Sequence, residues 1–427
     1  MKNLAFLMIT LAILGACHFN SNKNLNSTSN IETDKDNAGL KLPEGFSAII
    51  YADNIGHARH LSINTNGDVY VSLSSVKNGG GIVCLRDQDR DGRADLIKYH
   101  GIFDGTGIKI RNGYVYFGAD TVIVRYKLTE GELVPAETPE IIAKGFTPQN
   151  QHATKPFTFD QNGNIYVTVG APSNACQVLD RTKGSPGIDP CPILDLHGGI
   201  WRFKSDVLNQ DQAKDGYRYA TGIRNAVAIS WNDIENKLFA LQHGRDQLSQ
   251  LYPGIYTDAQ SAQLPAEEFL SVNDGSDFGW PYCYFDPSQN KKVLAPEYGG
   301  DGNKIGRCSG ADNPIIAFPA HTAPNDLLFY NGSMFPEKYK NGAFIAFHGS
   351  WNRAPLPQEG YYVAFVPFKG PVPSGDWEIF ANGFAGVGEV KSPGDAKHRP
   401  CGLAQAPDGS LFVSDDANGR IYRIAYN

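Results

Sequence analysis

The sequence has little that would support a helical, nucleic-acid-binding or metal-cluster protein. No long amphipathic helical pattern interrupts the chain. The formal net charge is -7 and nothing resembles a clustered basic face, which argues against a nucleic-acid partner. The 7 cysteines show no CxxC or CxxCH spacing, so neither a zinc site nor a c-type haem is expected. Charge therefore bears on solubility and little else.

What the sequence has in abundance is turn residues, with 46 Gly and 26 Pro, as in turn-rich all-β proteins. One unit recurs along the chain: a turn carrying Gly, usually with Asn or Asp, followed by an apolar and aromatic run. The turn residues supply the positive φ angles of a tight hairpin, and β-branched and aromatic residues suit a pleated, half-buried strand. The six copies are NTNGDVYVSL (64–73), IRNGYVYFGA (110–119), FDQNGNIYVTVG (159–170), NDIENKLFALQHG (232–244), KYKNGAFIAFHG (338–349) and APDGSLFVSDD (406–416).

Each repeat is predicted to be at least a hairpin, because five copies are followed by a second strand-like run. Six such units in one chain indicate an all-β, six-bladed β-propeller forming one domain over residues 41–427. The copies are unevenly spaced, so the later blades are expected to carry long loop insertions on a propeller face, where sites are built. The second runs are GIVCLRD (81–87), VIVRYKL (122–128), GGIWRFKSD (198–206), YYVAFVPF (361–368) and RIYRIAY (420–426).

The N-terminus reads as a targeting segment. Met1-Lys2-Asn3 precede an apolar run over residues 4–14, which is too short to span a bilayer comfortably as a helix. The run ends in Leu-Gly-Ala-Cys and resembles a bacterial lipobox, which implies a lipoprotein signal peptide over residues 1–16 and a lipid anchor on Cys17. An ordinary signal peptide with a coincidental Cys is the alternative. Residues 17–40 then form a flexible tether, and the protein is expected in the bacterial cell envelope, facing the periplasm or the cell surface.

The six remaining cysteines are even in number, and an oxidising compartment makes pairing the default. Sequence alone allows fifteen pairings. Proximity favours Cys176 with Cys191 and Cys283 with Cys308, each closing one insertion. A Cys84–Cys401 bond would join the first and last blades, which are neighbours in a closed ring.

Several motifs between the repeats carry polar residues to blade edges. At these motifs the chain resembles the pyrroloquinoline quinone (PQQ)-dependent glucose/sorbosone dehydrogenases, a family of six-bladed propellers, over roughly residues 40–427. Fold alone does not settle activity, because propellers host many functions. The motifs are HATKPFTFDQNGNIYVTVG (152–170), TGIRNAVAI (221–229), QHGRDQL (242–248), FGWPYC (278–283), HTAPNDL (321–327), FHGSWNR (347–353) and KHRPCGL (397–403).

The resemblance implies PQQ and Ca²⁺ as cofactors. His152 would be the general base that takes the substrate hydroxyl proton while hydride leaves the same carbon for the quinone. Arg224 would stabilise charge on the quinone oxygen, and Asn225 would be a further cofactor contact. The family's calcium takes backbone carbonyls from the loop matching 242–245, so Gly244 and Arg245 would be its ligands here.

A flat tricarboxylate such as PQQ needs cationic partners, and Arg pairs bidentately with carboxylates. Arg224, Arg353 and Arg399 lie in the matching motifs and would supply them. Other polar candidates, with helix or loop capping and inter-blade hydrogen bonds as the alternative reading, are Arg59, His60, His321, His348 and Asn352. Trp280 is expected to pack under an insertion.

A second calcium question arises at residues 87–95. Asp87, Asp89, Asp91 and Asp95 alternate around a Gly at the sixth position, as at the start of a calcium-binding loop, yet Lys98 stands at the twelfth position, where an EF-hand has Glu. A shorter structural calcium site and a solvated acidic hairpin tip are both compatible with this pattern.

The chain also departs from the soluble glucose dehydrogenases that it resembles, which have Pro where Arg245 stands and no evident counterpart of the long insertions 171–197 and 250–320. The motifs are closer to the sorbosone and pyranose dehydrogenase branch. The predicted substrate is therefore a sugar or a related polyol or aldehyde, with electrons passing to an external acceptor such as a cytochrome or quinone. The alternatives are a calcium-dependent lactonase-type propeller and a non-catalytic propeller that binds carbohydrate or protein.

Overall fold

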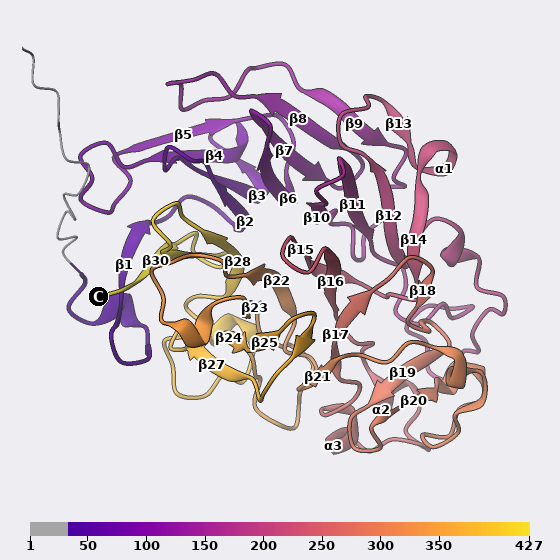
Figure 1. The fold of residues 1–427 in the computed structure, drawn as a ribbon. Helices are drawn as coiled ribbons and strands as arrows, with labels where there is room; N and C mark the ends of the chain where they lie inside the picture. The colour runs from indigo at the N-terminus through magenta and orange to yellow at the C-terminus, as the bar shows by residue number, and fades with distance from the viewer. Residues whose placement is uncertain (1–32) are drawn as a thin grey trace, which may run out of the picture.

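The structure, a computed structural model, describes residues 33–427. Within them the chain forms a six-bladed β-propeller with short helices (Figure 1), which confirms the predicted fold class. The predicted signal peptide, Cys17 and most of the predicted tether lie outside the described residues. None of the helices in the described part is long and apolar enough to cross a membrane.

Each blade is an antiparallel sheet of four main strands. The first three strands of each blade follow one another outwards from the inner edge in the order in which they occur along the chain. Blades one to three contain β2 (Ala58–Ile63), β3 (Val69–Lys77), β4 (Gly80–Arg86) and β5 (Leu96–His100); β6 (Gly105–Arg111), β7 (Tyr114–Ala119), β8 (Ile123–Lys127), β9 (Glu140–Lys144) and the added β13 (Gln210–Asp211); and β10 (Phe157–Phe159), β11 (Asn164–Val169), β12 (Gly199–Lys204), β14 (Tyr217–Thr221) and the added β18 (Ser276–Asp277).

Blades four to six follow the same plan, and the last blade takes its outer strand from the N-terminal side of the chain. They contain β15 (Ala226–Asn232), β16 (Lys237–Gln242), β17 (Glu267–Val272) and β21 (Ile316–Phe318); β22 (Pro324–Phe329), β23 (Ala343–Phe347), β24 (Tyr362–Val366) and β27 (Glu378–Ala381); and β28 (Pro400–Gln405), β29 (Leu411–Asp415), β30 (Ile421–Tyr426) and β1 (Phe46–Ala52).

The remaining elements are small. They are the hairpins β19 (Cys283–Asp286) with β20 (Lys291–Leu294) and β25 (Phe368–Lys369) with β26 (Val372–Pro373), the one-turn helices α1 (Gln212–Asp215), α2 (Leu248–Leu251) and α3 (Asp258–Ser261), and the 3-10 turns Asn37–Gly39, Pro192–Asp195, Pro296–Tyr298, Gly306–Gly310, Glu337–Tyr339 and Pro393–Asp395.

The six repeats are the turn between the first and second strands of each blade together with the second strand itself. Gly67 and Gly409 adopt φ angles of +93° and +92° in these turns, a conformation that favours glycine. In the fourth copy Asn236 takes the left-handed conformation instead, with φ +49°. The first strands contact one another in the cyclic order β2, β6, β10, β15, β22, β28, so they line the propeller axis.

Two features close the ring. Strand β1 pairs antiparallel with β30, with Phe46 opposite Tyr426, so the two ends of the domain complete one blade. Apolar side chains between adjacent blades form the core, for example Cys84, Ile108 and Phe117 between blades one and two. The last residues of the predicted tether also contact the domain, because Asp34 pairs with Arg93 at 2.7 Å and Leu40 is buried.

Two long insertions lie beside blades three and four. Insertion A, residues 171–197, joins β11 to β12, and insertion B, residues 273–315, joins β17 to β21. Figure 1 shows β19, β20, α2 and α3 gathered at the outer edge beside β17 and β21. The predicted disulfides Cys176–Cys191 and Cys283–Cys308 are confirmed, with S–S distances of 2.02 and 2.09 Å, and each closes one insertion.

The Cys84–Cys401 bond considered from the sequence is wrong: within residues 33–427 both cysteines are free, and both are buried. Cys84 on β4 faces blade two, on the side away from blade six, where it packs with Ile108. Cys401 is the second residue of β28 and accepts a hydrogen bond from Asn325 of blade five at 3.7 Å. Neighbouring blades do not by themselves bring two such side chains together.

Candidate active site on the upper face

The sequence-predicted polar residues gather on one face of the ring. We define the upper face as the one at which the first strands of the blades begin. It holds the segments before first strands, with His152, Arg224 and Arg399, and the segments after second strands, with residues 243–247 and Asp416. The antiparallel order of each blade puts the repeat turns and the Asp87–Asp95 loop on the opposite, lower face.

His152 is held in a strained turn ahead of β10. Its φ is +53°, uncommon for a residue with a side chain. The Gln149 amide donates to the carbonyls of Gln151, His152 and Gly170 at 2.7, 2.9 and 3.0 Å and so braces this turn. A Cβ on Gly170 would lie 2.6 Å from the His152 Cβ, so the position has no room for a side chain.

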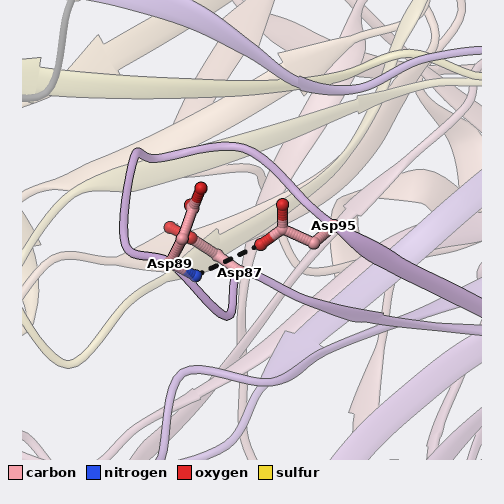
Figure 2. A group of neighbouring side chains, drawn as sticks. All are labelled: Asp87, Asp89 and Asp95. Atoms are coloured by element: carbon pink, nitrogen blue, oxygen red, sulfur yellow. Dashed lines mark hydrogen bonds between the residues drawn. The ribbon is translucent and has the colours of Figure 1, made fainter.

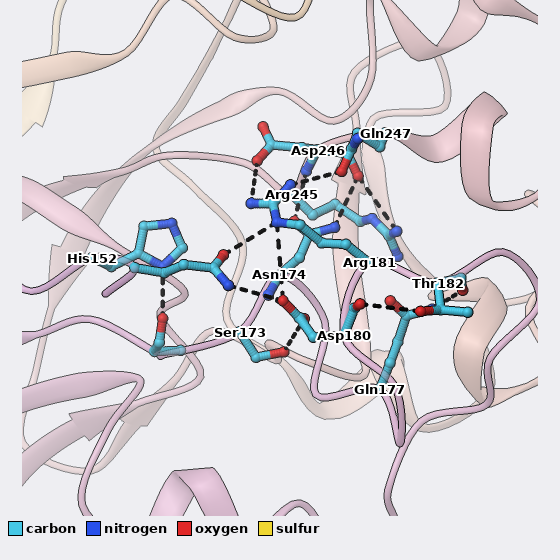
Figure 3. Close-up of polar contacts among 12 residues, drawn as sticks. His152, Ser173, Asn174, Gln177, Asp180, Arg181, Thr182, Arg245, Asp246 and Gln247 are labelled. Carbon is cyan, nitrogen blue, oxygen red and sulfur yellow. Dashed lines mark hydrogen bonds and ion pairs between the residues drawn. The ribbon is translucent and has the colours of Figure 1, made fainter. Parts of the chain in front are cut away.

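The tautomer of His152 follows from its partner. Its Nδ1 lies 2.6 Å from the Ala171 carbonyl oxygen, which only accepts, so Nδ1 carries the proton (Figure 3). Nε2 is then the nitrogen with the lone pair, as a general base requires. Burial, followed by the nearby Arg224 guanidinium, lowers the pKa of His152 to about 3, which keeps this lone pair available at neutral pH.

Arg224 is 3% exposed and is bound to the loop opposite it. Its Nη1 donates to the Gly244 carbonyl at 2.9 Å and its Nη2 to the Asp246 carboxylate at 2.7 Å. Its Nε is buried without a hydrogen-bond partner in the described part of the chain. A buried, unpaired donor on a cation fits an acceptor oxygen supplied by a bound ligand.

Asn225 and His243 form the next part of the face. The two side chains are close, with Asn225 Nδ2 3.4 Å from His243 Nδ1. On the other side of the ring, His243 Nε2 lies 3.0 Å from the Pro324 carbonyl oxygen. The carbonyl accepts, so Nε2 is protonated and Nδ1 is the acceptor. Burial, and then contact with the Arg224 charge, lowers the pKa of His243 to about 4.

We name residues 243–247 the carbonyl loop, because Gly244 and Arg245 are the predicted calcium ligands through their carbonyls. The Gly244 amide donates to the Glu267 carboxylate at 2.9 Å. The Arg245 side chain turns away from the face and pairs with Glu297 at 2.5 Å. Although burial raises the pKa of Asp246, the charges of Arg224 and Arg181 lower it to about 2, so this carboxylate is ionised.

The other half of the face is organised around Asp416. Its carboxylate accepts from Arg59 Nη1 at 2.7 Å and lies 2.6 Å from His348 Nε2. Arg399 donates to the His348 and Gly349 carbonyls at 3.1 and 3.0 Å. A cavity of about 590 Å³ opens beside these residues, lined in part by His57, Lys397 and Arg399. Its lining also includes the carboxylates of Asp395 and Asp416, so it carries both signs of charge.

Arg353 has a different environment. Its Nη1 donates to the Ala320 carbonyl at 3.0 Å, its Nε to the Pro357 carbonyl at 3.2 Å, and its Nη2 pairs with Glu359 at 2.7 Å. With every nitrogen engaged, Arg353 braces the loop after β23. Its predicted role as a cofactor contact stays a prediction.

Residues that sequence reasoning did not single out supply most of the partners on this face. Asp246 and Asp416 anchor the arginines, Gln149 braces the His152 turn, and Asn174 and Arg181 contact the carbonyl loop. Only the place of Asp246 and Asp416 just after the repeated second strands gave a signal. The partners of Gln149, Asn174 and Arg181 come from distant segments.

The lower-face aspartates are only partly brought together. Asp87, Asp89 and Asp95 each offer an oxygen within 4.8 Å of the others, and Figure 2 shows the three side chains around one loop. Asp91 stays outside this group and accepts from the Arg93 amide at 2.8 Å. Within residues 33–427 these three aspartates are the group of acidic side chains that lie close enough together to share a metal ion, and no such group is found on the upper face. The predicted structural calcium site stays a prediction.

That prediction has a direct test. If the loop binds calcium, millimolar Ca²⁺ is expected to raise the Tm of the PQQ-free protein by about 2–4 °C, because a ligand bound only to the folded state stabilises it. Differential scanning fluorimetry with Ca²⁺ or with a chelator measures this shift. The Asp89→Asn variant should lose it, and an unchanged shift in that variant contradicts the site.

The low pKa of the buried His243 predicts how the stability of the fold changes with pH. The unfolded chain protonates a histidine below about pH 6.5, whereas the folded protein protonates His243 only near its pKa of about 4. The folded state is therefore expected to lose stability as the pH falls from about 6.5 towards 4. Glu267 acts in the opposite direction, because burial raises its pKa to about 8.

Urea unfolding of wild type and His243→Gln at several pH values isolates this contribution, since Glu267 is common to both proteins. The variant should show a smaller loss of unfolding free energy on acidification. Parallel curves for the two proteins would show that His243 is not buried in its neutral form.

Fold and site together define a six-bladed propeller whose upper face carries a histidine, arginines paired with aspartates, and the carbonyl loop. The chain belongs to the family described as TrAA12-like, which it matches over residues 40–427. Among characterised relatives, a PQQ-dependent pyranose dehydrogenase of Coprinopsis cinerea is 28% identical over 430 residues, which cover 90% of this chain and 54% of that protein. An uncharacterised protein of Borreliella burgdorferi is 29% identical over 209 residues, 48% of each chain. The chain thus spans about half the length of the curated relatives it matches.

Solved structures agree on the fold. The holo form of the PQQ domain of the Coprinopsis cinerea pyranose dehydrogenase superposes with a TM-score of 0.71 at 19% identity, covering 90% of this chain and 97% of that one. The calcium structure of a Trichoderma reesei family AA12 enzyme superposes with a TM-score of 0.74 at 17% identity, covering 91% and 97%. At these identities the likeness concerns the fold.

Proposed function

We propose that this protein is a PQQ- and calcium-dependent dehydrogenase that oxidises a sugar, an aldose, a sorbosone-like aldehyde or a polyol, and passes the electrons to an external acceptor such as a cytochrome or quinone. The observation that carries the proposal is the constellation of His152, Arg224 and the carbonyl loop on one face of the propeller. Membership of the TrAA12-like family and the PQQ-dependent relative support it.

The residues present fit the cofactor pair. Arg224 Nε and Asn352 Nδ2 are buried donors without partners in the described chain, and each can donate a hydrogen bond to an oxygen of a bound ligand. Arg224, Asn225, Arg59 and Arg399 would hold the quinone, and the carbonyls of Gly244 and Arg245 would ligate calcium, a hard cation that takes oxygen ligands. The bound pair would supply a hydride-accepting carbonyl polarised by a Lewis acid.

The chain's own residues would then act on protons and charge. His152 Nε2 takes the proton of the substrate hydroxyl, and its Nδ1–H bond to Ala171 keeps the ring in the required orientation. The Arg224 guanidinium would hold its positive charge beside an oxygen of the bound group and so stabilise negative charge there. Asp246 keeps that guanidinium in place.

The lactonase alternative gains no support from the upper face. Its carboxylates Asp246 and Asp416 are paired with arginines at 2.7 Å rather than free to converge on one metal. We further propose that the protein is attached to the bacterial cell envelope through lipid on Cys17. Labelling with a lipid precursor in wild type and in Cys17→Ala tests this anchor.

Reconstitution tests the activity. The purified protein is treated with chelator, supplied with Ca²⁺ and PQQ, and assayed for a change in the quinone absorption spectrum and for dye reduction with a panel of aldoses and polyols. Both signals are expected with at least one sugar, and both should require Ca²⁺. If the spectrum does not change and no sugar reduces the dye, the protein is not a quinoprotein dehydrogenase.

A further inference from the structure

Insertions A and B both reach the carbonyl loop. We propose that Asn174 and Arg181 of insertion A and Glu297 of insertion B form a clamp that holds the carbonyl loop and Arg224 in position before any ligand binds. These three are positioning residues, since they act through the loop and not on substrate. The expected effect on calcium binding rests on the proposed function, whereas the clamp itself can be tested in the ligand-free protein.

The first arm is a reciprocal amide pair. Asn174 Nδ2 donates to the Asp246 carbonyl at 3.0 Å, and the Asp246 amide donates to Asn174 Oδ1 at 2.9 Å. Asn174 is fully buried, so water does not compete for these bonds. The pair holds both backbone polar groups of Asp246, the residue that directly follows the two predicted calcium ligands.

The second arm is Arg181, which lies beside Asp246 and Gln247 (Figure 3). It donates to the Asp246 carboxylate at 2.9 Å, to the Gln247 side chain at 2.7 Å and to the Gln151 side chain at 3.2 Å. The same Asp246 oxygen accepts from Arg224 at 2.7 Å. One carboxylate therefore ties Arg224 to insertion A, and Gln151 is the neighbour of His152.

The third arm is the buried pair of Arg245 and Glu297, whose side chains are 3% and 0% exposed. Insertion A meets the same residue, because the Gly187 amide donates to the Glu297 carbonyl at 3.0 Å. This buried ion pair restrains the carbonyl loop through the Arg245 side chain.

A pre-positioned loop binds calcium more tightly, because less conformational freedom is lost on binding. Residues that orient metal ligands typically contribute about 10–100-fold in metal affinity. Loss of one arm is therefore expected to weaken calcium binding by about tenfold or more while the propeller stays folded.

The test uses Asn174→Ala and Arg181→Ala, with Arg181→Lys as the conservative variant. Asp189→Asn is the matched control: Asp189 pairs with Arg307 at 2.9 Å and also joins the two insertions, but both side chains are about half exposed and neither contacts the carbonyl loop. Two quantities are measured, the amide hydrogen exchange of residues 243–247 in the ligand-free protein and the Kd for Ca²⁺ in the presence of PQQ.

Both alanine variants should speed exchange in residues 243–247 by about tenfold and raise the calcium Kd, Arg181→Lys should recover part of each, and Asp189→Asn should match wild type. Unchanged exchange in both alanine variants would overturn the clamp, as would an equal effect in the control. If wild type binds neither Ca²⁺ nor PQQ, the proposed function fails, and the exchange measurement still decides the clamp.

Discussion

The His152→Ala variant is expected to lose at least about a hundredfold in kcat while its Kd for PQQ stays within about threefold of wild type. A positioned general base contributes about 10²–10⁴-fold to the reaction rate. Nε2 of His152 carries the lone pair that this role requires, because Nδ1 donates its hydrogen to the Ala171 carbonyl. The ring contributes no charge to cofactor binding, because burial and Arg224 lower its pKa to about 3 and leave it neutral. Dye-reduction kinetics and a quinone titration measure the two quantities.

The control for this experiment is His197→Ala, which removes a half-buried histidine of insertion A that is not part of the proposed site. It should keep wild-type kcat. Partial recovery of the His152→Ala rate by added imidazole would support the role as base. Full activity in His152→Ala would show that another group takes the proton.

The Arg224→Ala variant is expected to weaken PQQ binding and turnover together and to destabilise the fold by about 3 kcal/mol. Removal of one member of a buried pair leaves its partner with less compensation, because Asp246 then keeps only the part-exposed Arg181. The loss of binding has a separate cause, since the unpaired Nε and the positive charge disappear from the face. Urea unfolding of the ligand-free protein and quinone titration follow the two effects independently.

A second substitution separates these two causes. Arg224→Ala with Asp246→Asn removes the unbalanced charge and should recover part of the stability, but it should not recover quinone binding. Arg224→Lys keeps the charge without the planar guanidinium and should fall between wild type and Arg224→Ala. Quinone binding within twofold of wild type in Arg224→Ala would contradict the proposed role.

The repeats made the blades predictable because their signals are local. A turn residue at Gly67 or Gly409 and the apolar residues that follow it fix a hairpin through contacts only a few residues apart. The third strand of blade four, β17, has no such neighbour, because the carbonyl loop and the short helices α2 and α3 separate it from β16. That strand was not predicted.

The candidate site divides in the same way. His152, Arg224, Asn225 and Arg399 were found from motifs in which each residue borders a repeat. Their partners were not, since Asp246 meets Arg181 across 65 residues of chain and Asp416 meets Arg59 across 357. Arg353 was predicted from its motif as a cofactor contact, but its bonds to the Ala320 carbonyl and to Glu359 could not be predicted from that motif.

The sequence by itself determined the six blades, the two short-range disulfides and the placement of polar residues at blade edges, because each follows from neighbouring residues and from the fixed geometry of a hairpin. Only the tertiary structure decided which charges meet. It buried Cys84 and Cys401 in separate places, assigned the free Nε of Arg224, and brought insertions A and B together on the carbonyl loop. Such contacts depend on how far each insertion extends and folds back, and no local pattern specifies that.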